Sequence, residues 1–325
     1  MENNGKYYIH RPNKWDSNAI HDYKKENYVY TELNDKTYAE ETLSDVSIQF
    51  SNEKKIIKTN RFPRFSSFWH NENDYLPEIV IASINSFLNV NYEYNLYTYK
   101  YFKNIPDGCI IKDANEIIPF EEFYLGSRND YASFADYFRI KMIEKVDTAW
   151  TDTDNFYLSD EFDGNGTVLL IHENRIQNGF FYISNDEESL KFKKLLIECY
   201  NNVDKILYTD SEELKKAKMD VSKYNIKKDK LKNAKWGFGG SCLFTSSFNN
   251  VDLKNNTFEY NKYFNGLSYQ SHYKYFVVPK KPYMDVYNKD VKLFILSTAL
   301  LVREPWIIEN FNEESYVSKV LKIKL

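Results

Sequence analysis

Hydrophobic and polar residues follow a regular pattern from Phe62 onward. Residues 66–70 read Ser-Ser-Phe-Trp-His, a short aromatic segment that predicts a strand. Apolar residues then recur every three or four positions over 76–88, which predicts a helix with Pro77 in its first turn. Residues 92–99 alternate as a second strand does. Strand, helix and strand in this order indicate a parallel βαβ unit.

The same alternation of elements continues along the chain. Helical spacing predicts helices over 133–145 and 188–201, and a lysine-rich, solvated helix over 211–235. Short apolar runs predict further strands at 109–111, 168–171 and 180–183. We therefore expect an α/β protein with a mainly parallel central sheet, flanked by helices and with additional helical elements after residue 188.

The first 60 residues differ from the rest, because they are polar, rich in Asn and Lys, and only weakly periodic. We interpret residues 1–60 as an irregular extension or a small accessory layer. Residues 61–325 are then expected to form the functional domain.

Composition excludes some partners. Of the 325 residues, 42% are hydrophobic and 17% aromatic, which is typical of a folded globular protein. The 43 Lys and Arg residues against 47 Asp and Glu residues give a net charge of -4, so no general attraction for nucleic acid is expected.

The cysteines and the apolar runs indicate the cellular compartment in which the protein is expected. Cys109, Cys199 and Cys242 are widely spaced and odd in number, which predicts neither a disulfide framework nor a zinc cluster. The N-terminus lacks the apolar stretch of a secretory signal, and the longest apolar run, 293–302, is too short to span a bilayer. A soluble, cytoplasmic protein is expected.

The motif Asp152-Thr153-Asp154 is the strongest candidate for chemistry. In extended backbone, residues two apart project to the same side, so both carboxylates could face one hard cation such as Mg²⁺ or Mn²⁺. A polar turn after a strand is the commoner explanation of an isolated Asp-X-Asp. The pair follows a short buried segment, however, and ligands of α/β sheets collect at the carboxyl ends of strands.

Several segments occur in an order that resembles a known family. They are Phe68-Trp69-His70, Ser86-Phe87-Leu88, Leu96-Tyr97-Thr98-Tyr99, Pro106-Asp107-Gly108, Asp113-Ala114-Asn115-Glu116-Ile117-Ile118-Pro119, Phe134-Ala135-Asp136-Tyr137-Phe138-Arg139 and Trp150-Thr151-Asp152-Thr153-Asp154. The series resembles the retaining GT-A glycosyltransferases with a DXD motif (glycosyltransferase family thirty-two), which include bacterial capsular-polysaccharide enzymes and the yeast outer-chain mannosyltransferase. The glucosyltransferase domains of large clostridial toxins are more distant relatives. The resemblance covers about residues 62–160.

The resemblance implies a GT-A fold with a donor-binding core over about residues 62–185. It implies transfer of a sugar, with retention, from a nucleotide-diphosphate sugar to a glycan or lipid-linked saccharide acceptor in surface polysaccharide or glycan synthesis. A UDP-sugar is the favoured donor and a GDP-sugar the other possibility, with Mn²⁺ or Mg²⁺ as cofactor. Peripheral association with the inner face of the membrane would suit such an acceptor.

The resemblance also assigns roles within the acidic motif. Asp152 would contact the donor sugar or ribose, and Asp154 would ligate the metal, with Asp152 as a further metal ligand. The family pattern usually has two glycines before the tryptophan, where this chain has Asp147-Thr148-Ala149. Both carboxylates are kept despite that difference.

Asp136 and Arg139 are three residues apart on the helix predicted over 133–145, and so share one face. An exposed helical ion pair is the alternative explanation, and such a pair contributes little stability. By resemblance, both side chains point into the donor pocket and hold sugar hydroxyls, and the arginine fork could also bind a phosphate oxygen.

Three further residues are donor-pocket candidates by resemblance. Trp69 would stack on the nucleotide base, unless it is a core residue. Asn178 would contact the donor sugar, unless 174–179 is a plain turn. Asp113 is a pocket candidate that could equally be a turn-former. Finally, amides of the glycine-rich loop 236–240 could bind the diphosphate.

Two other functions remain open from the sequence. A metal-dependent nucleotide-sugar hydrolase would use the same Asp pair with water as the acceptor. A non-catalytic nucleotide- or carbohydrate-binding protein could keep the same fold without turnover.

Overall fold

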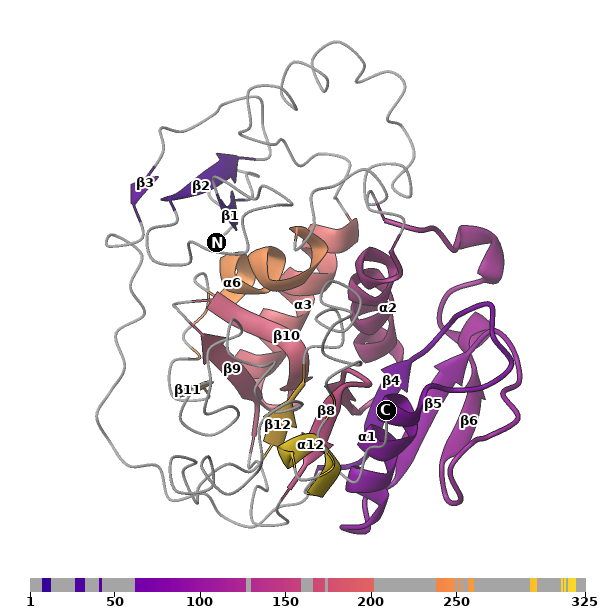
Figure 1. The fold of residues 1–325 in the computed structure, drawn as a ribbon. Coiled ribbons are helices and arrows are strands. Elements are labelled where there is room, and N and C mark those ends of the chain that lie inside the picture. Colours follow the sequence, from indigo (N-terminus) through magenta and orange to yellow (C-terminus); the bar gives the residue numbers. More distant parts are fainter. Residues whose placement is uncertain are drawn as a thin grey trace.

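The structure is a computed structural model, shown in Figure 1. It describes residues 62–126, 130–158, 166–172, 175–201 and 238–248, and parts of 251–259, 293–296 and 311–319. In the first 61 residues it describes three strands, β1 (Tyr8–Pro12), β2 (Asn27–Glu32) and β3 (Glu41–Thr42), which form a sheet of their own. The helix predicted over 211–235 and the start of the glycine-rich loop, 236–237, lie outside the described residues.

A central sheet of seven strands organises the rest, in the order β11-β9-β10-β7-β4-β5-β6. Its strands are β4 (Phe65–Phe68), β5 (Tyr94–Thr98), β6 (Ile110–Asp113), β7 (Ala149–Thr151), β9 (Val168–His172), β10 (Arg175–Tyr182) and β11 (Thr257–Glu259). The strands β7, β4, β5 and β6 run parallel, β11 is parallel to β9, and β10 is antiparallel to both of its neighbours. The predicted α/β class with a mainly parallel sheet is confirmed.

The predicted βαβ unit is also confirmed. Helix α1 (Glu78–Leu88) follows Pro77 and connects β4 to β5, and Phe65 pairs with Tyr94 in a parallel register. Asn91, with φ of 62°, ends the connection in the left-handed conformation that asparagine tolerates.

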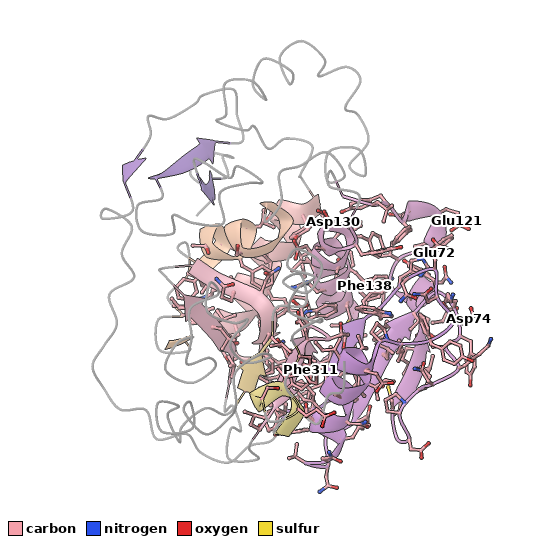
Figure 2. All side chains as sticks on the ribbon, viewed as in Figure 1. Glu72, Asp74, Glu121, Asp130, Phe138 and Phe311 are labelled. Carbon is pink, nitrogen blue, oxygen red and sulfur yellow. The ribbon has the colours of Figure 1, made fainter. Side chains whose placement is uncertain are left out.

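Neighbouring strand residues point to opposite faces and so build two cores. Helix α1 packs on one face against a cluster that includes Phe65, Leu96 and Phe180. The helices α2 (Ala132–Lys145), α3 (Glu187–Asn201) and α6 (Leu243–Phe248) pack on the other face, against Tyr97, Trp150 and Phe181 among others. Figure 2 labels one residue of this second cluster, Phe138, whose ring stacks on that of Phe68 at 4.5 Å between centroids.

The chain leaves the main sheet after β7. Residues 152–154 form a turn, in which the Asn155 amide donates to the Asp152 carbonyl over 3.2 Å. Strand β8 (Asn155–Tyr157) then pairs with β12 (Leu293–Ile295) in a two-stranded ribbon. The acidic pair thus occupies the bend between two strands of different sheets, so the rule that residues two apart in extended backbone project to the same side does not apply to Asp152 and Asp154.

Strand β10 begins five residues before the predicted start at 180. Its pairing with β9 shifts register between Gln177 and Phe181, so the residues between them form a bulge. The plain-turn alternative for Asn178 is thus wrong, since this residue lies inside a strand. No helix among the described residues is both long and apolar enough to cross a membrane.

Candidate functional site

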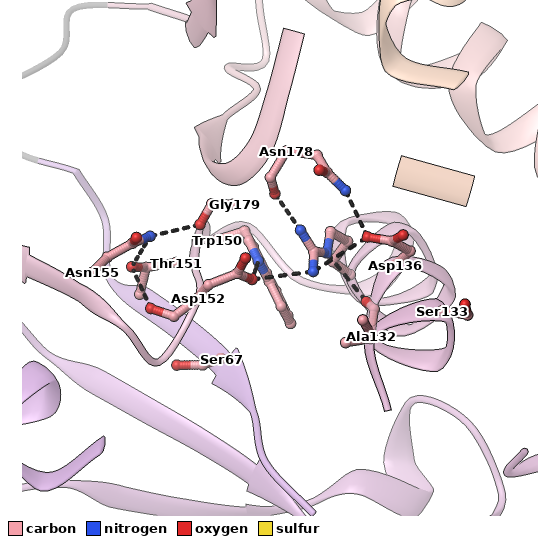
Figure 3. Close-up of polar contacts among 12 residues, drawn as sticks. Ser67, Ala132, Ser133, Asp136, Trp150, Thr151, Asp152, Asn155, Asn178 and Gly179 are labelled. Atoms are coloured by element: carbon pink, nitrogen blue, oxygen red, sulfur yellow. Dashed lines mark hydrogen bonds and ion pairs between the residues drawn. The ribbon is translucent and has the colours of Figure 1, made fainter. Parts of the chain in front are cut away.

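The carboxyl ends of the parallel strands β7, β4, β5 and β6 meet at one edge of the sheet. This edge carries three of the candidate residues: Asp152 directly after β7, Trp69 directly after β4, and Asp113 as the last residue of β6. Helix α2 and the bulge of β10 add the others to the part of the edge around Asp152, which Figure 3 shows.

Arg139 is the centre of this group and is almost fully buried, with 5% of its side chain exposed. Its Nη2 atom lies 3.1 Å from Asp152 Oδ1 and 3.4 Å from Asp136 Oδ1, so one guanidinium serves two carboxylates. The Nη1 atom donates to the Asn178 carbonyl, and Nε donates to the Ala135 carbonyl over 3.2 Å. Each of the three nitrogens is therefore bonded to a protein oxygen.

Trp150 supports Arg139 and Asp152 together. The guanidinium carbon lies 4.8 Å from the centroid of the Trp150 ring, within cation–π range. The indole Nε1 of the same ring donates to Asp152 Oδ1 over 2.8 Å. The position of this carboxylate is thus fixed by both a cation and a neutral donor.

Burial dominates the electrostatics of the two carboxylates. The side chain of Asp136 is 13% exposed, and burial raises the pKa of its carboxyl to about 6, against the opposing effects of Arg139 and the Asn178 amide. Desolvation also raises the pKa of Asp152, whose side chain is 35% exposed, although Arg139 and the Trp150 N–H oppose the shift. Because a single guanidinium faces two acidic groups, the two carboxyl titrations are linked.

The bulge in β10 explains how Asn178 reaches the site. Phe180 pairs with Thr151 in the antiparallel register, which brings Gly179 opposite Asp152, and the Asp152 amide donates to the Gly179 carbonyl over 2.7 Å. The Asn178 side chain then donates from Nδ2 to Asp136 Oδ1 over 2.7 Å. Bulges are frequent beside binding sites because they re-aim side chains in this way.

Sequence reasoning did not single out Asn155, the residue that follows the acidic pair. Its buried amide donates from Nδ2 to the Gly179 carbonyl over 2.7 Å and to Thr151 Oγ1 over 3.1 Å. Asn155 therefore ties the acidic turn to β10. The spacing along the sequence carries no signal for this role, because Gly179 is 24 residues away.

Asp154 is partly exposed in the same turn, and its carbonyl accepts from the Leu296 amide over 2.9 Å. The described residues contain no group of three or more His, Cys, Asp or Glu arranged to hold a metal ion. Mg²⁺ is often bound by one or two carboxylates together with substrate phosphates, and a partly exposed Asp154 fits that kind of site. Asp152 fits less well as a ligand, since Arg139 and Trp150 already bind its Oδ1.

Trp69 lies at the same sheet edge and is half-buried against the cluster that contains Phe65. Its backbone amide donates to the Tyr97 carbonyl over 3.0 Å, which continues the β4–β5 ladder by one residue. The indole Nε1 is buried without a hydrogen-bond partner among the described residues. The Trp69 ring therefore contacts the core, as a core residue does, and also lies at the sheet edge, as a base-stacking residue would.

Asp113 is not part of the Arg139 group in the described contacts. It is exposed and caps a short helical turn, where its Oδ1 accepts from the Asn115 amide over 2.9 Å and from Asn115 Nδ2 over 2.7 Å. These contacts are those of a turn-former.

The chain shows little similarity to known proteins. No protein-family model matches the chain, and no curated protein matches it. Among solved structures, the chain is similar to the PaToxG glycosyltransferase, with 13% identity, a TM-score of 0.35, and coverage of 57% of this chain and 67% of that one.

Proposed function

We propose that this chain is a glycosyltransferase that takes a sugar from a nucleotide-diphosphate sugar. One observation carries the proposal. Asp136, Arg139, Asp152 and Asn178, four residues singled out from the sequence as donor contacts, meet in one hydrogen-bonded group. They come from a helix, a turn after a strand and a bulge, and the group lies at the sheet edge where α/β proteins bind ligands.

The chemistry of the group suits a polyhydroxylated ligand. Carboxylate oxygens accept hydrogen bonds from sugar hydroxyls, and both carboxylates are held in place before any ligand arrives. Arg139 binds protein oxygens through each of its nitrogens. We therefore assign it the role of positioning Asp136 and Asp152, in place of clamping a phosphate.

The leaving group of the proposed reaction is a nucleoside diphosphate, whose developing negative charge needs compensation. Mn²⁺ or Mg²⁺, when bound with Asp154 as a ligand, would supply that charge as a Lewis acid. A UDP-sugar is the first donor to test and a GDP-sugar the second. The acceptor we propose is a glycan or a lipid-linked saccharide, with retention of the donor configuration.

The deciding experiment measures release of nucleoside diphosphate from a panel of UDP- and GDP-sugars with Mn²⁺, with and without saccharide acceptors. Acceptor-dependent release supports a transferase, and equal release without an acceptor supports the nucleotide-sugar hydrolase. Binding of a donor without any release supports the non-catalytic binding protein. If no donor raises the melting temperature and none is cleaved, the proposed function is wrong.

A further inference from the structure

Two glycines pack directly against the carboxylates of the site. Gly240 is buried in η5 (Phe238–Cys242), which precedes α6, and it lies at a kink where its φ of -95° and ψ of -118° are not helical. Gly179 lies in the bulge of β10. Both residues approach the group of Asp136, Arg139, Asp152 and Asn178 from outside helix α2.

The approach of Gly240 leaves no room for a side chain. A Cβ atom on Gly240 would lie 2.7 Å from Asn178 Nδ2, 2.8 Å from Asp136 Oδ2 and 3.0 Å from Asp136 Oδ1. Carbon does not approach nitrogen or oxygen this closely without a bond, so one of the atoms would have to move. These are the two side chains joined by the 2.7 Å hydrogen bond from Asn178 to Asp136.

Gly179 shows the same arrangement at the second carboxylate. A Cβ atom there would lie 2.9 Å from Asp152 Oδ2, while Asp152 Oδ1 is bound by Arg139 and Trp150. The neighbour of Gly240 differs, because a Cβ on Gly239 would meet the Tyr200 hydroxyl at 3.0 Å and Asp136 Cβ at an ordinary 3.5 Å. Of the three described glycines beside this site, only Gly240 and Gly179 approach carboxylate oxygens of the group closely.

We propose that Gly240 is a positioning residue of the donor site, whose missing side chain lets the η5 turn cover the Asn178–Asp136 hydrogen bond and hold both groups in place. This inference rests on the proposed function, since it takes the group as the donor site. With Gly240 above it and Arg139 beside it, Asp136 has little freedom to rotate. Gly179 restrains Asp152 in the same way from β10.

The packing has a consequence for how the site is assembled. Helix α2 alone sets the spacing of Asp136 and Arg139, but the orientation of the Asp136 carboxylate depends on a segment about 100 residues later in the chain. Any shift of η5 would release the Asn178 amide and the carboxylate together. The position of η5 is thus coupled to the geometry offered to a sugar.

The test compares Gly240→Ala with Gly239→Ala in the full chain. The first readout is the side-chain amide resonance of Asn178 by nitrogen-15 NMR, together with its protection from solvent exchange. We expect Gly240→Ala to shift this resonance and to lower its protection at least tenfold, whereas Gly239→Ala leaves it near the parent position. The second readout is donor turnover, where we expect kcat to fall at least tenfold for Gly240→Ala and to change less for Gly239→Ala.

Gly240→Ala could also prevent folding, and a double variant covers that outcome. In Gly240→Ala/Asn178→Ala the amide is gone and the Asp136 carboxylate can turn away from the new methyl group. Recovery of a folded chain by the double variant supports the proposal, and continued failure to fold overturns it. A folded Gly240→Ala with an unchanged Asn178 resonance also overturns it. Absence of turnover in the parent would count against the proposed function alone, because the NMR and folding measurements need no donor.

Discussion

At the residue scale, the central feature is a buried arginine shared by two carboxylates. Arg139 and Asp136 were expected to share a helix face, and the exposed ion pair was the alternative explanation. The structure excludes that alternative, because the Arg139 side chain is 5% exposed and Asp136 is 13% exposed. Removing Arg139 leaves Asp136 and Asp152 without the one cation that the described residues place against them.

Arg139→Ala is therefore expected to lower the free energy of unfolding by about 3–5 kcal/mol, the usual effect of breaking a buried ion pair. Urea unfolding followed by circular dichroism measures this. Lys141→Ala is a matched control on the same helix, since Lys141 pairs with Glu144 nearer the surface and its loss should change stability by about 1 kcal/mol or less. Equal, small losses in both variants would contradict the role assigned to Arg139.

Asp136 predicts a pH dependence of stability. Its pKa is about 6 in the folded chain against 3.8 for an ordinary aspartate, so the folded chain binds the proton more tightly than the unfolded chain does. Stability from this group should fall as the pH rises from about 4 to about 6, by at most about 1.4 kcal/mol per pH unit. The test measures the free energy of unfolding of the parent and of Asp136→Asn against pH across this range. If the two curves run parallel, the prediction is wrong. Because Asp152 is also paired with Arg139, the difference between the two curves reports the linked titration of Asp136 and Asp152.

Trp69 has two possible roles, as a core residue or as a residue that stacks on the donor base, and variants at this position distinguish them. If its ring stacks on the base of the donor, Trp69→Ala should weaken nucleotide affinity by about 1–3 kcal/mol, as loss of a stacked aromatic does elsewhere. Calorimetry on the folded variant measures the affinity, and Trp69→Phe is the control that keeps a ring. Unaltered affinity in a destabilised Trp69→Ala would assign the residue to the core alone.

At the element scale, the helices α1, α2 and α3 and the short strands β4, β6 and β9 were predicted within a few residues, whereas the start of β10 was missed. Helix α2 was expected over 133–145 and spans Ala132–Lys145, because several apolar residues at helical spacing fix both the element and its buried face. The pair Asp152 and Asp154 was expected at the end of a strand, and β7 does end at Thr151. The direction of the bend that follows was not predicted, because it depends on the tertiary pairing of β8 with β12.

Strand β10 is a second element that the local sequence did not predict in full. Asn178 and Gly179 are typical turn residues, and nothing local distinguishes a turn from a bulge. Only the register with β7 places Gly179 opposite Asp152. The identities of the site residues could thus be proposed from the sequence, whereas their contacts with one another depended on strand pairing.

The acidic turn allows a test of metal binding by Asp154. Asp154 is partly exposed at the bend, so Asp154→Ala should keep the native circular dichroism spectrum and abolish the Mn²⁺-dependent release of nucleoside diphosphate. Asp147→Ala is a control from the same sheet, since Asp147 lies before β7 at the opposite end of that strand. Undiminished release by Asp154→Ala in EDTA-treated buffer would contradict the proposed metal role.

At the scale of the whole molecule, the sheet separates two cores. The face toward α2 carries the site residues Arg139 and Trp150, while the face toward α1 carries the cluster around Phe65. Substitutions in the cluster around Phe65 should therefore change stability without altering the geometry on the face toward α2.

Phe65→Ala tests this separation. The ring is fully buried and lies 4.7 Å from Phe87 and 4.9 Å from Tyr92 between centroids, so its loss should lower the free energy of unfolding by about 3–5 kcal/mol. The side-chain amide resonance of Asn178, which reports the Arg139 group, should keep its parent position in the folded fraction. A shifted resonance would show that the two faces are coupled. Donor affinity is a poorer readout, because Trp69, a candidate for stacking on the base, packs against the same cluster as Phe65.

The chain order of the site has a consequence for synthesis on the ribosome. A nascent chain that has emerged as far as Thr151 already holds β4, β5, β6 and β7, which pair in parallel, together with Arg139 on α2. Asn178 and Gly240 are translated later, so the guanidinium lacks the Asn178 carbonyl until β10 emerges, and the Asn178–Asp136 hydrogen bond lacks its cover by Gly240 until η5 emerges. Parallel strands with long connections fold slowly, and the incomplete sheet exposes β7 as an edge until β10 covers it. This interval is when a chaperone that shields apolar edges would most improve the yield of native protein.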